Sequence, residues 1–139
     1  SPILQSPFGS YVNYYLLFIN PCNPSQVLSV GYRTTDIFSQ PGSWYTSGWE
    51  FYAIVFDEGG SNGKISLYRN GALTEESPSD LNINNPPETP DPDFYVGTQS
   101  ASGGIPNPST SLKGELDDLR IYNRVLSLGE INKLFEYVS

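Results

Sequence analysis

The last part of the chain carries the pattern that most limits the possible folds. Residues 115–122 follow Gly114 and have the composition of a β-strand. Ser127 and Glu130 then have the spacing of a capping box, in which each side chain bonds the backbone N–H of the other residue. The residues that follow place an apolar stripe on one helical face: Ile131, Leu134, Phe135 and Val138. The pattern predicts a strand and then one short helix over residues 127–138.

The rest of the chain has the composition of β-structure. Runs of aromatic and β-branched residues are interrupted by Pro, Gly and Asn. Asn70-Gly71 is a strong hairpin signal, because both residues tolerate a positive φ. The expected strands are residues 11–19, 26–35, 49–57, 64–69, 72–76 and 93–99. We expect 26–35 to be the hairpin partner of 11–19.

Three segments between these strands have the composition of loops. Residues 39–48 are polar, residues 78–92 contain five prolines, and residues 100–111 are rich in Gly, Ser and Pro. Loops longer than about a dozen residues are uncommon in a compact domain. Binding residues occur frequently on loops that a rigid scaffold positions. The long loops are therefore where we expect binding.

Four segments together carry a family resemblance: WEFYAIVFD at 49–57, LYRNG at 67–71, FYVG at 94–97 and GELDDLRIYNRVLS at 114–127. They resemble the signature of the laminin-G-like, concanavalin A-type jelly-roll domains. The resemblance covers residues 47–137 and implies an all-β, concanavalin A-like jelly-roll sandwich of antiparallel strands with one short C-terminal helix. We expect residues 1–139 to form a single domain of this type.

The start of the chain departs from the family pattern. Such domains usually begin with two further strands, including an Asp-Gly loop that often helps to hold calcium. Residues 1–10 do not have the composition to supply them. Either the sandwich is shortened, or these strands come from elsewhere in a longer parent protein or from another chain. An unfilled sheet edge favours strand addition, so we expect residues 11–35 to flank an exposed or borrowed edge.

Composition excludes several classes of function. The chain has 15 acidic and 7 basic residues, a net charge of −8, which argues against nucleic acid as a partner. It has no run of about 18 apolar residues, so no membrane insertion is expected. The chain contains no His, which excludes His-ligated zinc and His-based triads. Cys22 is the single cysteine, so it forms no disulfide within the chain.

One acidic cluster raises the question of catalysis. Alternation in the predicted strand places Glu115 and Asp117 on the same face. A retaining glycosidase of this fold resembles the pattern Glu-x-Asp-x-Glu, with the nucleophile and the acid/base on one strand face. Leu119 occupies the third position here, so the catalytic pair is incomplete. We expect no enzymatic activity.

The same acidic residues are candidates for a cation site. Carboxylate oxygens are the ligands that Ca²⁺ prefers. The candidate metal ligands are Asp117, Asp118, Asp57 and Asp93, with no EF-hand spacing among them. The alternative is structural: Asp117 or Asp118 forms a backbone hydrogen bond or an ion pair with Arg120 or Arg124.

Aromatic side chains in loops and on the first long strand are the candidates for sugar binding. Their rings would stack on pyranose faces while neighbouring polar groups bond the hydroxyls. The candidate ligand-binding residues are Trp44, Tyr45, Tyr11 and Tyr14. Trp49 opens a predicted core strand, and we expect it to be buried.

By analogy with the family, we expect a non-catalytic extracellular or cell-surface binding module. Its partner would be a glycan or a cell-surface protein, and calcium is a candidate cofactor. The alternative is a structural subunit of a surface assembly that associates through sheet edges and loops. A binding module of the first kind should lose sugar binding on Trp44→Ala, whereas an assembly unit should self-associate and be indifferent to sugars.

Overall fold

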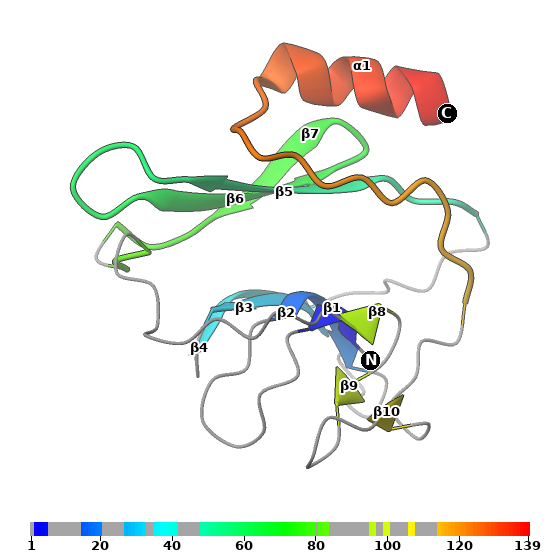
Figure 1. Ribbon diagram of the computed structural model, residues 1–139, viewed down its shortest axis with the longest axis horizontal. Helices are drawn as coiled ribbons and strands as arrows, with labels where there is room; N and C mark the ends of the chain where they lie inside the picture. Colours follow the sequence, from blue (N-terminus) through cyan, green and yellow to red (C-terminus); the bar gives the residue numbers. More distant parts are fainter. Residues whose placement is uncertain are drawn as a thin grey trace. The chain divides into compact units, whose positions relative to one another are not determined.

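The computed structural model describes residues 2–5, 15–20, 27–32, 35–41, 48–79, 81–83, 95–96, 99–100, 106–107 and 114–139. Within these ranges the chain has ten strands and one helix (Figure 1). They belong to two compact units. The first unit comprises Ser1–Tyr45 and Glu88–Leu119, and the second comprises Thr46–Pro87 and Arg120–Ser139. No helix among the described residues has both the length and the apolar character needed to cross a bilayer.

The first unit contains a five-stranded antiparallel sheet with the order β4-β3-β2-β1-β8. Its strands are β1 Pro2–Gln5, β2 Tyr15–Asn20, β3 Val27–Tyr32, β4 Thr35–Pro41 and β8 Tyr95–Val96. A separate antiparallel pair is formed by β9 Gln99–Ser100 and β10 Pro106–Asn107. The predicted hairpin between residues 11–19 and 26–35 is confirmed, because β2 pairs with β3.

Two expectations for this unit are wrong. Residues 1–10 do supply a strand, since β1 pairs with β2 through Pro2, Leu4 and Gln5, with register shifts between these pairs. The expected loop at 39–48 starts later, because β4 continues to Pro41 opposite Val27. With β1 beside β2 and β4 beside β3, residues 15–32 lie inside the described sheet rather than next to an open edge.

The second unit contains a three-stranded antiparallel sheet with the order β5-β6-β7. Strand β5 spans Tyr52–Asp57, β6 spans Lys64–Arg69 and β7 spans Ala72–Glu76. The last two have the bounds that the sequence predicts, whereas β5 begins three residues later than expected. Asn70 has a φ of 50° and Gly71 a φ of 81°. Both positions thus lie in the left-handed region that a tight two-residue hairpin turn requires.

The core of the second unit lies at the central strand. Ile65 and Leu67 of β6 are fully buried, and Ser66 between them is 5% exposed. Side chains alternate between faces along a strand, so this run means that both faces of β6 are buried. Ser77 extends the pairing beyond β7: its N–H donates to the Ile65 carbonyl at 2.8 Å and its hydroxyl accepts from the Ile65 N–H at 2.9 Å.

The helix α1, Leu128–Val138, forms as the sequence predicts. The Ser127 hydroxyl accepts from the Glu130 N–H at 3.3 Å, and the Ser127 N–H donates to the Glu130 carboxylate at 2.8 Å. Ile131 of the apolar stripe is fully buried, whereas Val138 is exposed. Helix α1 lies over one face of the three-stranded sheet (Figure 1), with the Phe135 ring 5.9 Å from that of Phe51.

The strand predicted over residues 115–122 and the burial predicted for Trp49 are also wrong. Residues 114–126 contain no strand, although a strand was predicted over 115–122. Asp118 has a φ of 54°, outside the β region, so the backbone is not a regular pleated strand at this position. The predicted alternation, with Glu115 and Asp117 on one strand face and Asp118 on the other, therefore does not hold. Trp49 is 67% exposed rather than buried, because it precedes the first residue of β5 by three positions.

Candidate functional site

The predicted sugar-binding aromatics lie outside the described residues. They are Trp44, Tyr45, Tyr11 and Tyr14, and the candidate metal ligand Asp93 also lies outside. A sugar-binding surface formed by these rings therefore stays a prediction.

The described carboxylates of the predicted metal site take part in local turns. The Asp57 carboxylate accepts from the Gly59 N–H at 2.8 Å, directly after β5. The Asp117 carboxylate accepts from the Asp118 N–H at 2.8 Å, so the structural interpretation of this residue as a backbone partner is confirmed. Among the residues that the structure describes, no three His, Cys, Asp or Glu side chains gather into a group that could hold a metal. Calcium binding stays a prediction.

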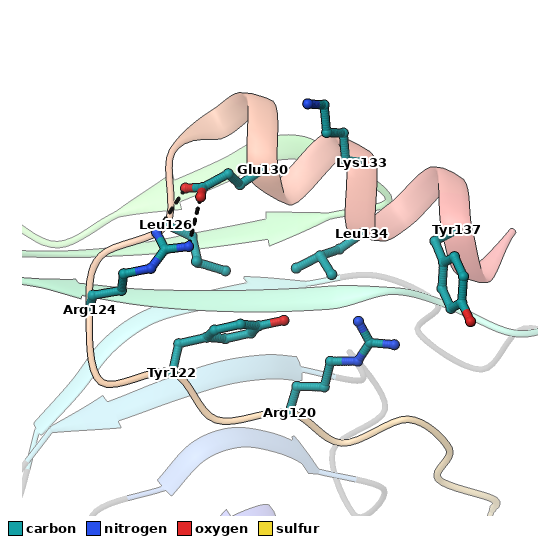
Figure 2. A pocket seen from close by; sticks show the side chains of 8 residues that line it. All are labelled: Arg120, Tyr122, Arg124, Leu126, Glu130, Lys133, Leu134 and Tyr137. Atoms are coloured by element: carbon teal, nitrogen blue, oxygen red, sulfur yellow. Dashed lines mark hydrogen bonds and ion pairs between the residues drawn. The ribbon is translucent and has the colours of Figure 1, made fainter.

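A groove of about 500 Å³ lies between the segment 120–126 and α1 (Figure 2). We call it the helix groove; its lining residues are Arg120, Tyr122, Arg124, Leu126, Glu130, Lys133, Leu134 and Tyr137. The four residues from the segment are every second position of the chain from 120 to 126. The four from α1 are spaced i, i+3, i+4 and i+7, which is one helical face. The groove is thus formed by one side of each element.

An ion pair closes one end of the helix groove. The Arg124 guanidinium donates to both carboxylate oxygens of Glu130, at 2.7 Å and 3.1 Å. This guanidinium, together with the backbone N–H of Ser127, lowers the pKa of Glu130 to about 2. Glu130 therefore joins the segment to the helix cap while remaining ionised at neutral pH.

The other end of the helix groove is aromatic and cationic. The Arg120 guanidinium lies 5.4 Å from the centre of the Tyr137 ring, within the range of a cation–π contact. Tyr137 is 78% exposed and Tyr122 is 41% exposed. Figure 2 shows the Arg120 guanidinium directed toward the helix, with the hydroxyl end of Tyr122 directed toward Arg120. Apolar rings and a cation therefore share one open surface.

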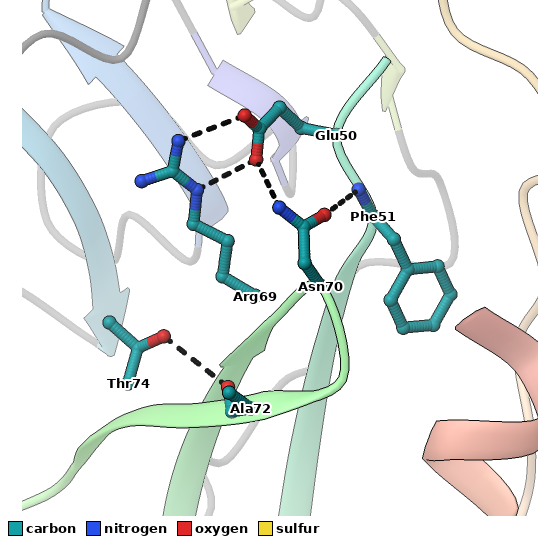
Figure 3. A network of polar contacts seen from close by, with 6 residues as sticks. All are labelled: Glu50, Phe51, Arg69, Asn70, Ala72 and Thr74. Carbon is teal, nitrogen blue, oxygen red and sulfur yellow. Dashed lines mark hydrogen bonds and ion pairs between the residues drawn. The ribbon is translucent and has the colours of Figure 1, made fainter. Parts of the chain in front are cut away.

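A second polar cluster has a structural role. The Arg69 guanidinium donates to both oxygens of Glu50, at 2.7 Å and 3.0 Å (Figure 3). The Asn70 side-chain amide donates to Glu50 at 2.9 Å and accepts from the Phe51 N–H at 3.0 Å. The bond to Glu50 raises the pKa of Arg69. Because these groups bond one another, the cluster holds the hairpin turn to the chain that enters β5.

Sequence reasoning missed the helix groove. The available signal was the alternation of Arg120, Tyr122 and Arg124, with two cations and a ring at every second position of the segment. Arg124 was proposed as a partner of Asp117 or Asp118, whereas the structure pairs it with Glu130. The capping residue Glu130 was predicted for its role in α1 alone.

Comparison with known proteins gives a family and one structural likeness. The family model described as the concanavalin A-like lectin/glucanases superfamily matches residues 3–132. A solved structure of an S-layer domain-containing protein from Clostridium thermocellum is similar at 18% sequence identity and a TM-score of 0.42. The alignment covers 97% of this chain and 64% of that one, so the chain spans less than two thirds of that structure. No curated protein matches the chain.

Proposed function

Since the chain belongs to the concanavalin A-like lectin/glucanases superfamily, we propose that it is a non-catalytic extracellular binding module for carbohydrate or cell-surface components. The family match over residues 3–132 is the observation that carries this proposal. The scaffold would be a single jelly-roll sandwich. Support comes from the strand pairs described, all of which are antiparallel.

Two features of the acidic segment support a role without catalysis. A retaining glycosidase needs two carboxyl groups held about 5–5.5 Å apart on either side of the scissile bond. Leu119 stands where the family's glycosidase pattern has its second Glu. In addition, the segment from Glu115 is not part of a sheet, and the Asp117 carboxylate is engaged by the next backbone N–H.

The proposed ligand surface is formed by the aromatic residues that the sequence predicts for sugar binding: Trp44, Tyr45, Tyr11 and Tyr14. Tryptophan and tyrosine rings suit this role because they combine an apolar face with a polar edge. Calcium is the proposed cofactor, with oxygen ligands drawn from Asp117, Asp118, Asp57 and Asp93.

The test is a glycan array of the purified chain, run once with calcium and once with chelator. Trp44→Ala should abolish the signal, and Trp49→Ala is the matched control because this exposed tryptophan lies outside the proposed surface. Binding that needs calcium supports both the module and the metal. Binding that survives chelation keeps the module and excludes the metal. An array without any signal contradicts carbohydrate recognition.

A second candidate function is a structural unit of a surface assembly. It is favoured by the three-stranded sheet, in which β5 and β7 are outer strands of the described sheet. Outer strands offer N–H and C=O groups to a strand from another chain. Light scattering across a concentration series would test it: self-association together with a silent glycan array would support the assembly unit over the binding module.

A further inference from the structure

The Arg124–Glu130 pair of the helix groove is open to solvent and balanced in charge. Its two side chains are 56% and 41% exposed. The low pKa of Glu130, about 2, keeps the carboxylate ionised at neutral pH, and the guanidinium that bonds both of its oxygens balances this charge. A ligand at this end of the groove therefore meets hydrogen-bonding groups and no unbalanced charge of the pair.

Each member of the pair keeps a hydrogen-bonding position beyond those used within it. Arg124 donates through Nη1 to Glu130 Oε2 and to the Val125 carbonyl, and through Nη2 to Glu130 Oε1. Among the described residues, the second N–H of Nη2 has no acceptor, and Oε1 has no donor besides Nη2. Because Nη2 and Oε1 are 2.7 Å apart, this donor and this acceptor lie side by side. A hydroxyl both donates and accepts, so two neighbouring hydroxyls match the arrangement.

The Tyr122 ring supplies an apolar surface close to this pair. Tyr122 precedes Arg124 by two positions, so their Cα atoms are at most about 7 Å apart. Tyr122 is 41% exposed, and Leu126 and Leu134 of the same lining are half-buried. Figure 2 shows the Tyr122 ring between the side chains of Arg124 and Arg120. An aromatic ring of this kind can stack on the C–H face of a sugar whose hydroxyls reach the pair.

The remaining side chains of the lining are placed differently. Tyr137 follows Glu130 by seven residues on α1, about 10 Å along the helix axis, which is too far for one pyranose to contact both. The Arg120 guanidinium already lies over the Tyr137 ring. Lys133 extends from α1 away from the Tyr122 ring (Figure 2). A sugar between Tyr122 and the Arg124–Glu130 pair therefore uses none of these three side chains.

We propose that the helix groove binds a neutral pyranoside, with the C–H face of the sugar against the Tyr122 ring and two neighbouring hydroxyls at the Arg124–Glu130 pair. The groove volume of about 500 Å³ lies within the range of small-molecule sites. Hydrogen bonds to charged groups are about twice as strong as neutral ones, so a neutral ligand can be held there. The inference deepens the proposed function and rests on its carbohydrate recognition. It names a ligand class and a surface other than the aromatic residues predicted from the sequence.

The test compares two neutral ligands, methyl β-glucoside and its 3-deoxy analogue. Every pair of neighbouring ring hydroxyls in the glucoside includes the 3-hydroxyl, so the analogue has no such pair. Each ligand is titrated into the full chain while the tyrosine resonances are followed by NMR. We expect the glucoside to bind about tenfold more tightly, which is the effect of one hydrogen bond to a charged group.

Variants of the groove assign this preference to the ion pair. Arg124→Met should remove most of the tenfold preference, because it takes away the donor beside Glu130 Oε1. Lys133→Met is the matched control: it removes the same charge from the same lining and should change the affinity by less than about twofold. Equal affinities of the wild type for the two sugars, or an Arg124→Met variant that keeps the preference, overturn the inference.

A second pair of variants keeps the test valid if Arg124→Met does not fold. Tyr122→Leu should weaken both sugars severalfold, because stacking does not depend on the 3-hydroxyl. Tyr137→Leu is its control and should leave both affinities within about twofold of the wild type. Far-ultraviolet circular dichroism checks that each variant retains its structure. A Tyr137→Leu variant that weakens binding as much as Tyr122→Leu contradicts the proposed position of the sugar.

The inference and the proposed function can fail separately. If glycans bind on the array through Trp44 while the glucoside does not bind at Tyr122, the proposed function stands and the groove site is wrong. If no sugar binds in either experiment, carbohydrate recognition is wrong and the groove site falls with it.

Discussion

Arg69 and Arg120 both belong to segments that resemble the family signature, but their surroundings differ. Arg69 forms two hydrogen bonds with Glu50, and the two side chains are 27% and 17% exposed. Arg120 lies over a ring that is 78% exposed, at the edge of an open groove. Loss of a guanidinium that is enclosed with its carboxylate partner leaves a partly buried charge uncompensated, whereas a cation–π contact at an exposed ring contributes about 0.5–1 kcal/mol. The difference separates an enclosed ion pair at the hairpin from an open aromatic surface at the helix groove.

The largest effect should come from Gly71→Ala, at the hairpin side of this comparison. A Cβ at Gly71 would lie 2.9 Å from the Asn132 side-chain oxygen and 3.1 Å from Phe135 Cδ1. The φ of +81° adds left-handed strain of about 1–2 kcal/mol, and displacing the helix adds about as much again. We expect the free energy of unfolding in urea to fall by about 3 kcal/mol.

The matched control for this substitution is Gly60→Ala. Gly60 has nearly the same φ, +77°, but nothing lies within 4 Å of an added Cβ. It should lose about 1 kcal/mol, which is the strain alone. Equal losses in the free energy of unfolding at the two glycines would show that the contacts with helix α1 add no cost at the hairpin turn.

Arg69→Met should have the next largest effect. It removes both hydrogen bonds from the guanidinium to Glu50, a partly buried carboxylate that also accepts from the Asn70 amide. We expect a loss of about 2 kcal/mol in the free energy of unfolding. Arg124→Met is the matched control. The Arg124–Glu130 pair has the same shortest N–O distance, 2.7 Å, but its two side chains are 56% and 41% exposed. A larger loss for Arg124→Met would mean that burial does not decide the strength of these pairs.

Ser127→Ala should have a smaller effect, at the helix that forms one side of the groove. It removes the hydroxyl that accepts from the Glu130 N–H and keeps the backbone bond from Ser127 N–H to Glu130. Loss of an N-cap side chain costs about 1 kcal/mol. Ser139→Ala at the other end of α1 is the control, since its hydroxyl makes one long, exposed bond to Glu136. Thermal unfolding of the two variants should differ accordingly.

The smallest effect should be the acid dependence of the Arg124–Glu130 pair. The pKa of Glu130 is lowered from 4.5 to about 2 in the folded protein, so its stabilising contribution is present above pH 4.5. This contribution should be lost as the pH falls from 4.5 toward 2. Glu130→Gln should therefore unfold at a lower temperature than the wild type at pH 6, and the two should converge near pH 2. A difference that persists at pH 2 would assign the effect to packing and not to charge.

The sequence predicted the hairpin region well because its signals are local. Asn70-Gly71 requires a positive φ at two adjacent residues, and this alone places the turn between β6 and β7. The capping box of Ser127 and Glu130 similarly places the start of α1. The family motif identified the superfamily for the same reason, since it lies in contiguous segments.

The predictions that failed depend on contacts distant in sequence. No local rule shows that β1 pairs with β2, and the positive φ of Asp118 cannot be inferred from an Asp in an apparent strand. The helix groove needs residues of the segment 120–126 and of α1 to meet, so a list of aromatic residues could not locate it. Trp44 and the other predicted ring positions rest on composition, and the glycan array remains their test.

The central claim is that the Arg69–Glu50 pair, enclosed at the hairpin, stabilises the fold more than the Arg124–Glu130 pair, which is open to solvent at the helix groove. The most direct measurement is the free energy of unfolding in urea of Arg69→Met and of Arg124→Met, each compared with the wild type. The account predicts that Arg69→Met loses about 2 kcal/mol and that Arg124→Met loses clearly less. Equal losses in the two variants would contradict the claim.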